Sequence, residues 1–143
     1  MTVAIARQVA LEVLIRVEAD DAYANLLLNQ LSTSKRLDSR NAALAQELAF
    51  GSLRRKNTLE AIINEVSSRP VADLDPGVRA VLQLGVYQLL YTRIPVHAAL
   101  NESVEQSKVF AGGKASGLVN ASLRKVAQND LDYWMHAILA KAI

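Results

Sequence analysis

The side chains of this sequence that could do chemistry are mostly cations. Arg54-Arg55-Lys56 is the only run of three basic residues, and it lies where a helix is expected to end. A second basic stretch follows Gly112-Gly113, where a helix is expected to begin. The free backbone N–H groups of a helix start can hold a phosphate, and neighbouring Lys or Arg side chains add charge. The candidate phosphate-binding residues are Arg7, Lys114, Ser116, Asn120, Arg124 and Lys125, with Arg54 and Arg55 as weaker candidates because cations also stabilise helix ends.

Groups for catalysis or metal binding are scarce. The chain has no cysteine and two histidines, which excludes thiolate mechanisms, disulfide scaffolds and cysteine-ligated metals. The carboxylates Asp20-Asp21, Asp73 and Asp75 lie at expected helix boundaries, where helix caps are the ordinary explanation. Gly112-Gly113 and Gly117 lack the G-x-G-x-x-G spacing of a nucleotide-binding loop. We therefore expect no catalytic residue, no metal site and no cofactor in this chain.

The composition is that of one packed domain. Of 143 residues, 51% are hydrophobic and 21% are charged, and the net charge is only +2. Nucleic-acid binding would therefore depend on where the cations are placed and not on their number. No apolar run approaches the roughly 18 residues of a membrane span, and the N-terminus does not resemble a signal peptide. We expect a cytoplasmic protein that does not associate with a membrane.

The elements that must position the cations are helices. Apolar residues recur every four positions at Val9, Val13 and Val17, and Asp38 is placed to cap a later helix. Asp75-Pro76 opens a stretch that is apolar on nearly all sides, as expected for the centre of a bundle. No alternating pattern typical of a strand and hairpin is present. The predicted fold is all-α, a compact bundle of seven or eight helices.

The last residues form an unusually apolar end. After Asp130, a potential cap, Tyr133, Trp134, Ile138 and Leu139 lead to the final residue. Natural chain ends are usually polar and frayed. Two interpretations stay open: the chain is a piece of a longer one whose last helix packs on an absent part, or this helix docks on its own bundle. We assign residues 1–128 to the domain and residues 129–143 to a terminal helix or the start of a linker.

Four segments in order resemble the NusB-like RNA-binding fold. They are ALAQELAFGSLRR (43–55), VRAVLQLGVYQLLY (78–91), IPVHAALNESVE (94–105) and LVNASLRK (118–125), with ARQVALEVL (6–14) in the first helix. The resemblance covers nearly the whole chain. It implies a bundle of seven or eight helices that binds RNA through its basic residues.

Two subfamilies share this fold. The segments FGSLRR, GVYQLL and VNASLRK resemble the N-terminal domain of Sun/RsmB-type rRNA (cytosine-5) methyltransferases. That resemblance implies an RNA-binding accessory domain whose partners are small-subunit rRNA and a methyltransferase domain in the same protein. One alternative is a free-standing transcription antitermination factor that binds boxA RNA together with a small-subunit ribosomal protein. Another alternative is a helical module that docks only protein.

Departures from the antitermination pattern favour the first interpretation. The N-terminus carries only Arg7, and Ile15 and Leu118 occupy positions where those factors often have aromatic side chains that stack on bases. Methylation at carbon 5 of cytosine needs a cysteine nucleophile, and this chain has none. We therefore expect this chain to be non-catalytic, with S-adenosylmethionine bound by a catalytic domain beyond residue 143.

Overall fold

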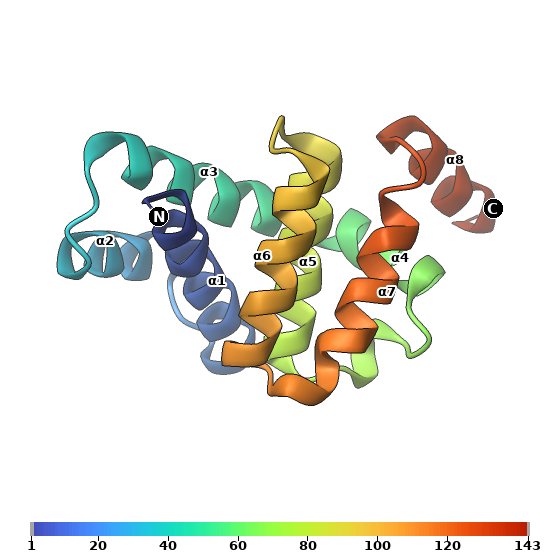
Figure 1. Cartoon of the computed structure of the whole chain (residues 1–143), viewed down its shortest axis with the longest axis horizontal. Coiled ribbons are helices and arrows are strands. Elements are labelled where there is room, and N and C mark those ends of the chain that lie inside the picture. The colour runs from blue at the N-terminus through green and yellow to red at the C-terminus, as the bar shows by residue number, and fades with distance from the viewer. Residues whose placement is uncertain (1, 143) are drawn as a thin grey trace. The chain divides into compact units, whose positions relative to one another are not determined.

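The computed structural model describes residues 2–142, and over these residues it contains eight α-helices, two short 3-10 helices and no strand. The all-α prediction and the predicted number of helices are therefore confirmed. The chain divides into two compact units, Met1–Arg54 and Arg55–Ile143. Each unit is described by itself, with the helices labelled as in Figure 1.

The first unit contains α1 (Thr2–Asp20), α2 (Ala24–Ser34) and α3 (Ser39–Arg54). Helix α1 packs on α3 and on α2 (Figure 1). Two of the three valines of its predicted apolar stripe are buried, Val9 at 1% and Val13 at 0% exposure, while Val17 near the end of the helix is only partly buried. Asp38 caps α3, because its carboxylate accepts a hydrogen bond from the backbone N–H of Asn41 at 2.8 Å.

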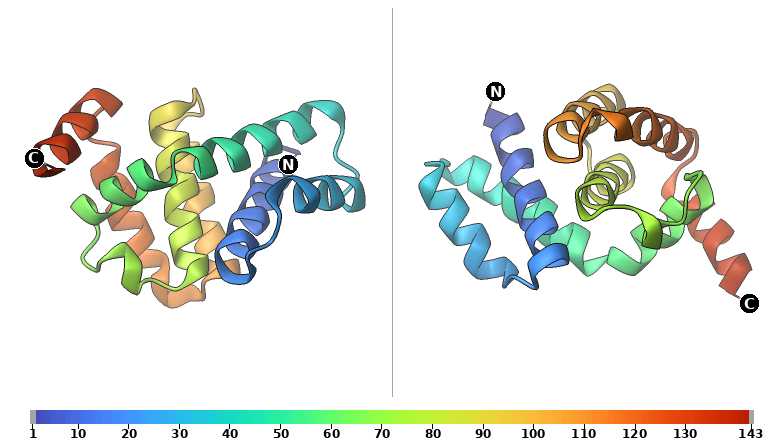
Figure 2. Two further views of the ribbon diagram at one scale, coloured as in Figure 1. Left: turned by 180° about the vertical axis from the view of Figure 1, so that it is seen from behind. Right: turned by 90° about the horizontal axis from the view of Figure 1, so that it is seen from below.

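The second unit is built around α5 (Pro76–Tyr91), which contacts α4 (Lys56–Val66), α6 (Val96–Phe110) and α7 (Ser116–Val126). The views of Figure 2 place α5 among these helices. Every residue of α5 from 80 to 88 is buried, which confirms the predicted central helix. Proline stands at its first position, where its fixed φ suits a helix start. A short 3-10 helix, Val71–Asp73, precedes α5.

The connection between α6 and α7 is set by glycines. Gly112 follows the end of α6 with φ of 72°, a left-handed conformation that glycine adopts without a steric cost. The 3-10 helix Gly113–Ala115 then leads directly into α7. At the start of α5, Gly77 comes so close to α6 that a Cβ there would lie 2.6 Å from the carbonyl oxygen of Phe110. The missing side chain of Gly77 therefore lets α5 approach the end of α6.

The last helix, α8 (Leu131–Ala142), packs on α4. Asp130 caps it by accepting a hydrogen bond from the backbone N–H of Tyr133 at 3.0 Å. The buried indole of Trp134 donates to the carbonyl oxygen of Val126 at 3.0 Å, and Lys141 forms an ion pair with Glu65 at 2.9 Å. Helix α8 thus docks on its own unit, while the interpretation that involves chain beyond residue 143 stays a prediction.

Among the helices that the structure describes, none combines the length and the hydropathy needed to cross a bilayer.

Candidate nucleic-acid interface

Helices α6 and α7 form an open groove of about 570 Å³. We call it the α6/α7 groove, and its lining residues are Asn101, Val104, Glu105, Ser116, Gly117 and Asn120. Each helix contributes residues three or four positions apart, which share one helix face. The groove therefore brings together Ser116 and Asn120, two of the residues predicted to bind phosphate, with residues of α6.

Helical periodicity decides which face of α7 lines the groove. Val119, Leu123 and Val126 are fully buried, so the opposite side of the helix faces outward. Ser116, Asn120 and Arg124 follow one another at intervals of four residues along the edge of this outer face, where Ser116 and Asn120 are half-buried and Arg124 is exposed. The exposed Arg124 donates from Nε to Oδ1 of Asn120 at 3.1 Å, which holds its guanidinium beside the groove.

Lys114 lies at the other end of α7. It is exposed within the 3-10 helix Gly113–Ala115, immediately before the first turn of α7. Backbone N–H groups of a helix start favour anions, and a lysine beside them adds a full charge. Lys114 and Arg124 thus place a cation near each end of the outer face of α7.

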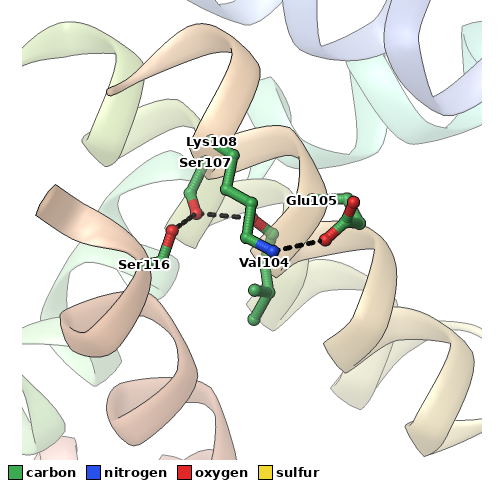
Figure 3. A network of polar contacts seen from close by, with 5 residues as sticks. All are labelled: Val104, Glu105, Ser107, Lys108 and Ser116. Atoms are coloured by element: carbon green, nitrogen blue, oxygen red, sulfur yellow. Dashed lines mark hydrogen bonds and ion pairs between the residues drawn. The ribbon is translucent and has the colours of Figure 1, made fainter. Parts of the chain in front are cut away.

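Two hydroxyl groups and one backbone carbonyl hold the start of α7 against α6 (Figure 3). Ser107, which is buried, donates from Oγ to the carbonyl oxygen of Val104 at 2.6 Å. The hydroxyl of Ser116 lies 3.0 Å from that of Ser107. These contacts position Ser116 at the edge of the groove.

Lys108 is a cation of this region that the sequence analysis missed. Its Nζ lies 2.9 Å from Oε2 of Glu105, and both side chains are more than half exposed (Figure 3). Asn101, Glu105 and Lys108 share one face of α6, so helical spacing from Asn101 could have identified the lysine. Lys108 has no basic neighbour in the sequence and does not lie at a helix start, so neither of these two signals identifies it.

Two other predicted residues do not line the groove and have partners within the second unit. The Nζ of Lys125 donates at 3.5 Å to the carbonyl oxygen of Val66, the last residue of α4, where a cation suits the helix dipole. The guanidinium of Arg55 lies 4.5 Å from the centre of the Tyr91 ring, which itself stacks on Tyr87. Both cations therefore have a structural role, and their contact with phosphate stays a prediction.

Arg7 and Arg54 belong to the first unit. Arg54 is exposed at the end of α3 and borders a hollow of about 330 Å³ with Glu47 and Phe50. Arg7 is only 5% exposed, and its side chain has an interaction partner. A phosphate would meet Arg54 more readily than Arg7, and the role of both residues stays a prediction.

The groups around the α6/α7 groove are suited to binding. They offer cations, amides, one carboxylate and a helix start, which recognise charge and hydrogen-bonding groups. Over residues 2–142 there is no group of three or more histidine or acidic side chains arranged to hold a metal ion.

Comparison with known sequences gives one family and a set of larger relatives. A family model described as the NusB family matches residues 4–128. A protein of Mycobacterium tuberculosis, named as a putative methyltransferase, is 40% identical over 130 residues, which are 91% of this chain and 28% of that protein. Ribosomal RNA small subunit methyltransferase B of Klebsiella pneumoniae is 42% identical over 64% of this chain and 21% of its own length. The chain thus spans about a quarter of the length of these relatives.

Comparison with solved structures supports the fold. A structure of the antitermination factors NusB and NusE in complex with dsRNA matches with a TM-score of 0.80 and 22% identity, over 87% of this chain and 95% of that chain. NusB of T. maritima matches with a TM-score of 0.82 and 19% identity, over 94% of this chain and 96% of that chain. At these identities the similarity concerns the arrangement of the helices.

Proposed function

Because the chain belongs to the NusB family, we propose that it is an RNA-binding domain that serves a methyltransferase acting on small-subunit rRNA. The observation that carries this proposal is the outer face of α7, where the exposed cations Lys114 and Arg124 flank a groove lined by amides and hydroxyls. Phosphate contacts position a protein on RNA, and hydrogen bonds to base edges add specificity.

The proposed division of labour follows from the chemistry of cytosine methylation. Methylation at carbon 5 of cytosine begins when a thiolate attacks carbon 6 of the same ring. None of the 143 residues is a cysteine, so this chain has no thiolate to supply. We propose that residues 1–128 hold the RNA. The nucleophile and the binding site for S-adenosylmethionine would belong to another part of a longer methyltransferase, similar to the relatives named above. The named relatives support this, because the chain corresponds to only 28% and 21% of their lengths. Such a protein would act in the cytoplasm, where rRNA is assembled in bacteria.

A transcription antitermination factor is the second candidate function. The TM-score of 0.80 with NusB in its complex with NusE and dsRNA favours it. The sequence identities favour the first candidate, the domain of a methyltransferase. This chain is 40–42% identical to the methyltransferase relatives and 22% identical to that NusB chain. Binding of boxA RNA that strengthens when the small-subunit ribosomal protein is added would support the second candidate.

The proposal predicts RNA binding that weakens steeply with salt. Each phosphate neutralised on a single strand contributes about −0.7 to the slope of log affinity against log salt concentration. Contacts from Lys114 and Arg124 alone therefore give a slope of about −1.4 or steeper. Fluorescence anisotropy with labelled fragments of small-subunit rRNA, repeated over a series of salt concentrations, measures this slope. No binding at low salt, or an affinity that salt does not change, would overturn the proposal.

A further inference from the structure

We propose that the α6/α7 groove holds one unpaired guanine, whose edge is read by Glu105, Ser116 and Asn120. This inference rests on the proposed function, because it assumes that RNA lies along the outer face of α7. It goes further by assigning a base preference and the residues that set it.

The carboxylate of Glu105 indicates what kind of group the groove accepts. A carboxylate repels phosphate and only accepts hydrogen bonds. Its Oε2 pairs with Lys108 at 2.9 Å, which leaves the other oxygen to accept a hydrogen bond from a ligand. The groove therefore suits a base that presents N–H groups, while the RNA phosphates lie nearer to Lys114 and Arg124.

The orientation of the Asn120 amide follows from its contact with Arg124. A guanidinium has only donors, so the amide atom 3.1 Å from Nε of Arg124 must be the oxygen. The amide nitrogen, with two protons, is then left to donate to a ligand in the groove that Asn120 lines. Asn120 thus supplies a donor to the groove.

The hydroxyl of Ser116 can accept a hydrogen bond from a ligand but cannot donate one, because its own proton is already used. Ser107 uses its single hydroxyl proton in the 2.6 Å bond to the carbonyl oxygen of Val104. In the 3.0 Å contact between the two serines, Ser116 must therefore be the donor (Figure 3). Its proton is used in that bond, so in the groove that Ser116 lines its hydroxyl oxygen can only accept.

This set of groups, two acceptors and one amide donor, matches guanine. The Watson–Crick edge of guanine carries one acceptor, O6, beside two donors, N1–H and the N2 amine. The free oxygen of Glu105 can accept from N1–H, the hydroxyl oxygen of Ser116 can accept from the N2 amine, and the amide nitrogen of Asn120 can donate to O6. Adenine and cytosine place a ring-nitrogen acceptor next to their amine, which the carboxylate would repel. Uracil offers a single donor between two acceptors, so it would leave one of the two acceptors of the groove without a partner.

The test compares RNAs that differ in one base. The probes are labelled uridine oligonucleotides with a central guanosine, adenosine or inosine, which lacks the N2 amine. We expect guanosine to bind about tenfold more tightly than adenosine, with inosine between them, since a good pair of hydrogen bonds discriminates bases by that order. Glu105→Gln should reduce the guanosine preference to about twofold or less. The same change should leave the affinity for the adenosine probe equal or higher, because a negative charge is lost.

Asp132→Asn is the matched control, since it removes one exposed carboxylate from α8, outside the groove. This variant should keep the guanosine preference, and thermal melting should show that both variants are folded. RNA binding without a guanosine preference, or a preference that survives Glu105→Gln, would overturn the guanine pocket and leave the proposed function standing. No binding to any RNA, including the rRNA fragments, would overturn both.

Discussion

Reversing the charges of Lys114 and Arg124 together, as Lys114→Glu and Arg124→Glu, is expected to weaken RNA binding by well over tenfold. Both side chains are exposed beside the α6/α7 groove, so two phosphate attractions become repulsions. The slope of log affinity against log salt should also become shallower by about 1.4, since two phosphate contacts are lost. Fluorescence anisotropy with the rRNA fragments measures both effects.

A charge-matched variant separates this local effect from the change in net charge. Lys35→Glu and Arg40→Glu together remove the same charge from exposed positions in the first unit, which are not among the predicted contacts. We expect this control to lower the affinity by much less. The α7 face would be excluded as the binding surface if the Lys114/Arg124 variant bound RNA normally. An equal loss in both variants would exclude it as well.

Gly77→Ala is expected to destabilise the protein by about 1–3 kcal/mol, the usual cost of overpacking. Alanine normally stabilises a helix relative to glycine by about 1 kcal/mol. Here the added Cβ would lie 2.6 Å from the backbone carbonyl oxygen of Phe110, which cannot rotate away as a side chain could. Because Phe110 ends α6, relief of this clash would also disturb the turn that carries Lys114. Urea unfolding followed by circular dichroism measures the change in stability.

Gly117→Ala provides the matched comparison. Gly117 lies in the first turn of α7, and a Cβ there would meet no atom within 4 Å. We expect this variant to be unchanged or stabilised by about 0.4–1 kcal/mol, because alanine restricts the unfolded chain. If Gly77→Ala stabilised the protein as Gly117→Ala does, the close approach of α5 to the end of α6 would be wrong.

The helix boundaries were predictable because their signals are local. Asp38 and Asp130 cap the helices that follow them, and Pro76 begins α5 as the sequence indicates. Gly112 lies just past the end of α6 with a positive φ. The central place of α5 was also predictable, since a helix that is apolar on nearly all sides must be surrounded.

The site was predictable only in part, because it depends on contacts between distant residues. Arg124 and Lys125 are neighbours in the sequence, yet Arg124 binds Asn120 beside the groove while Lys125 reaches the end of α4. Successive helical residues point about 100° apart, so a basic pair does not form one patch. The stacking of Arg55 on Tyr91 depends on how α4 packs on α5, which the spacing of basic residues does not reveal.

The most direct test asks where RNA lies on the protein. In an NMR titration of the ¹⁵N-labelled chain with a fragment of small-subunit rRNA, backbone amide shifts report the contact surface residue by residue. We expect the largest shifts at residues 113–124 and at Asn101 and Glu105, in the connection before α7, in α7 and on the groove side of α6. Shifts that concentrate on α8 or in the first unit, with the groove amides unmoved, would contradict an RNA-binding face on α6 and α7.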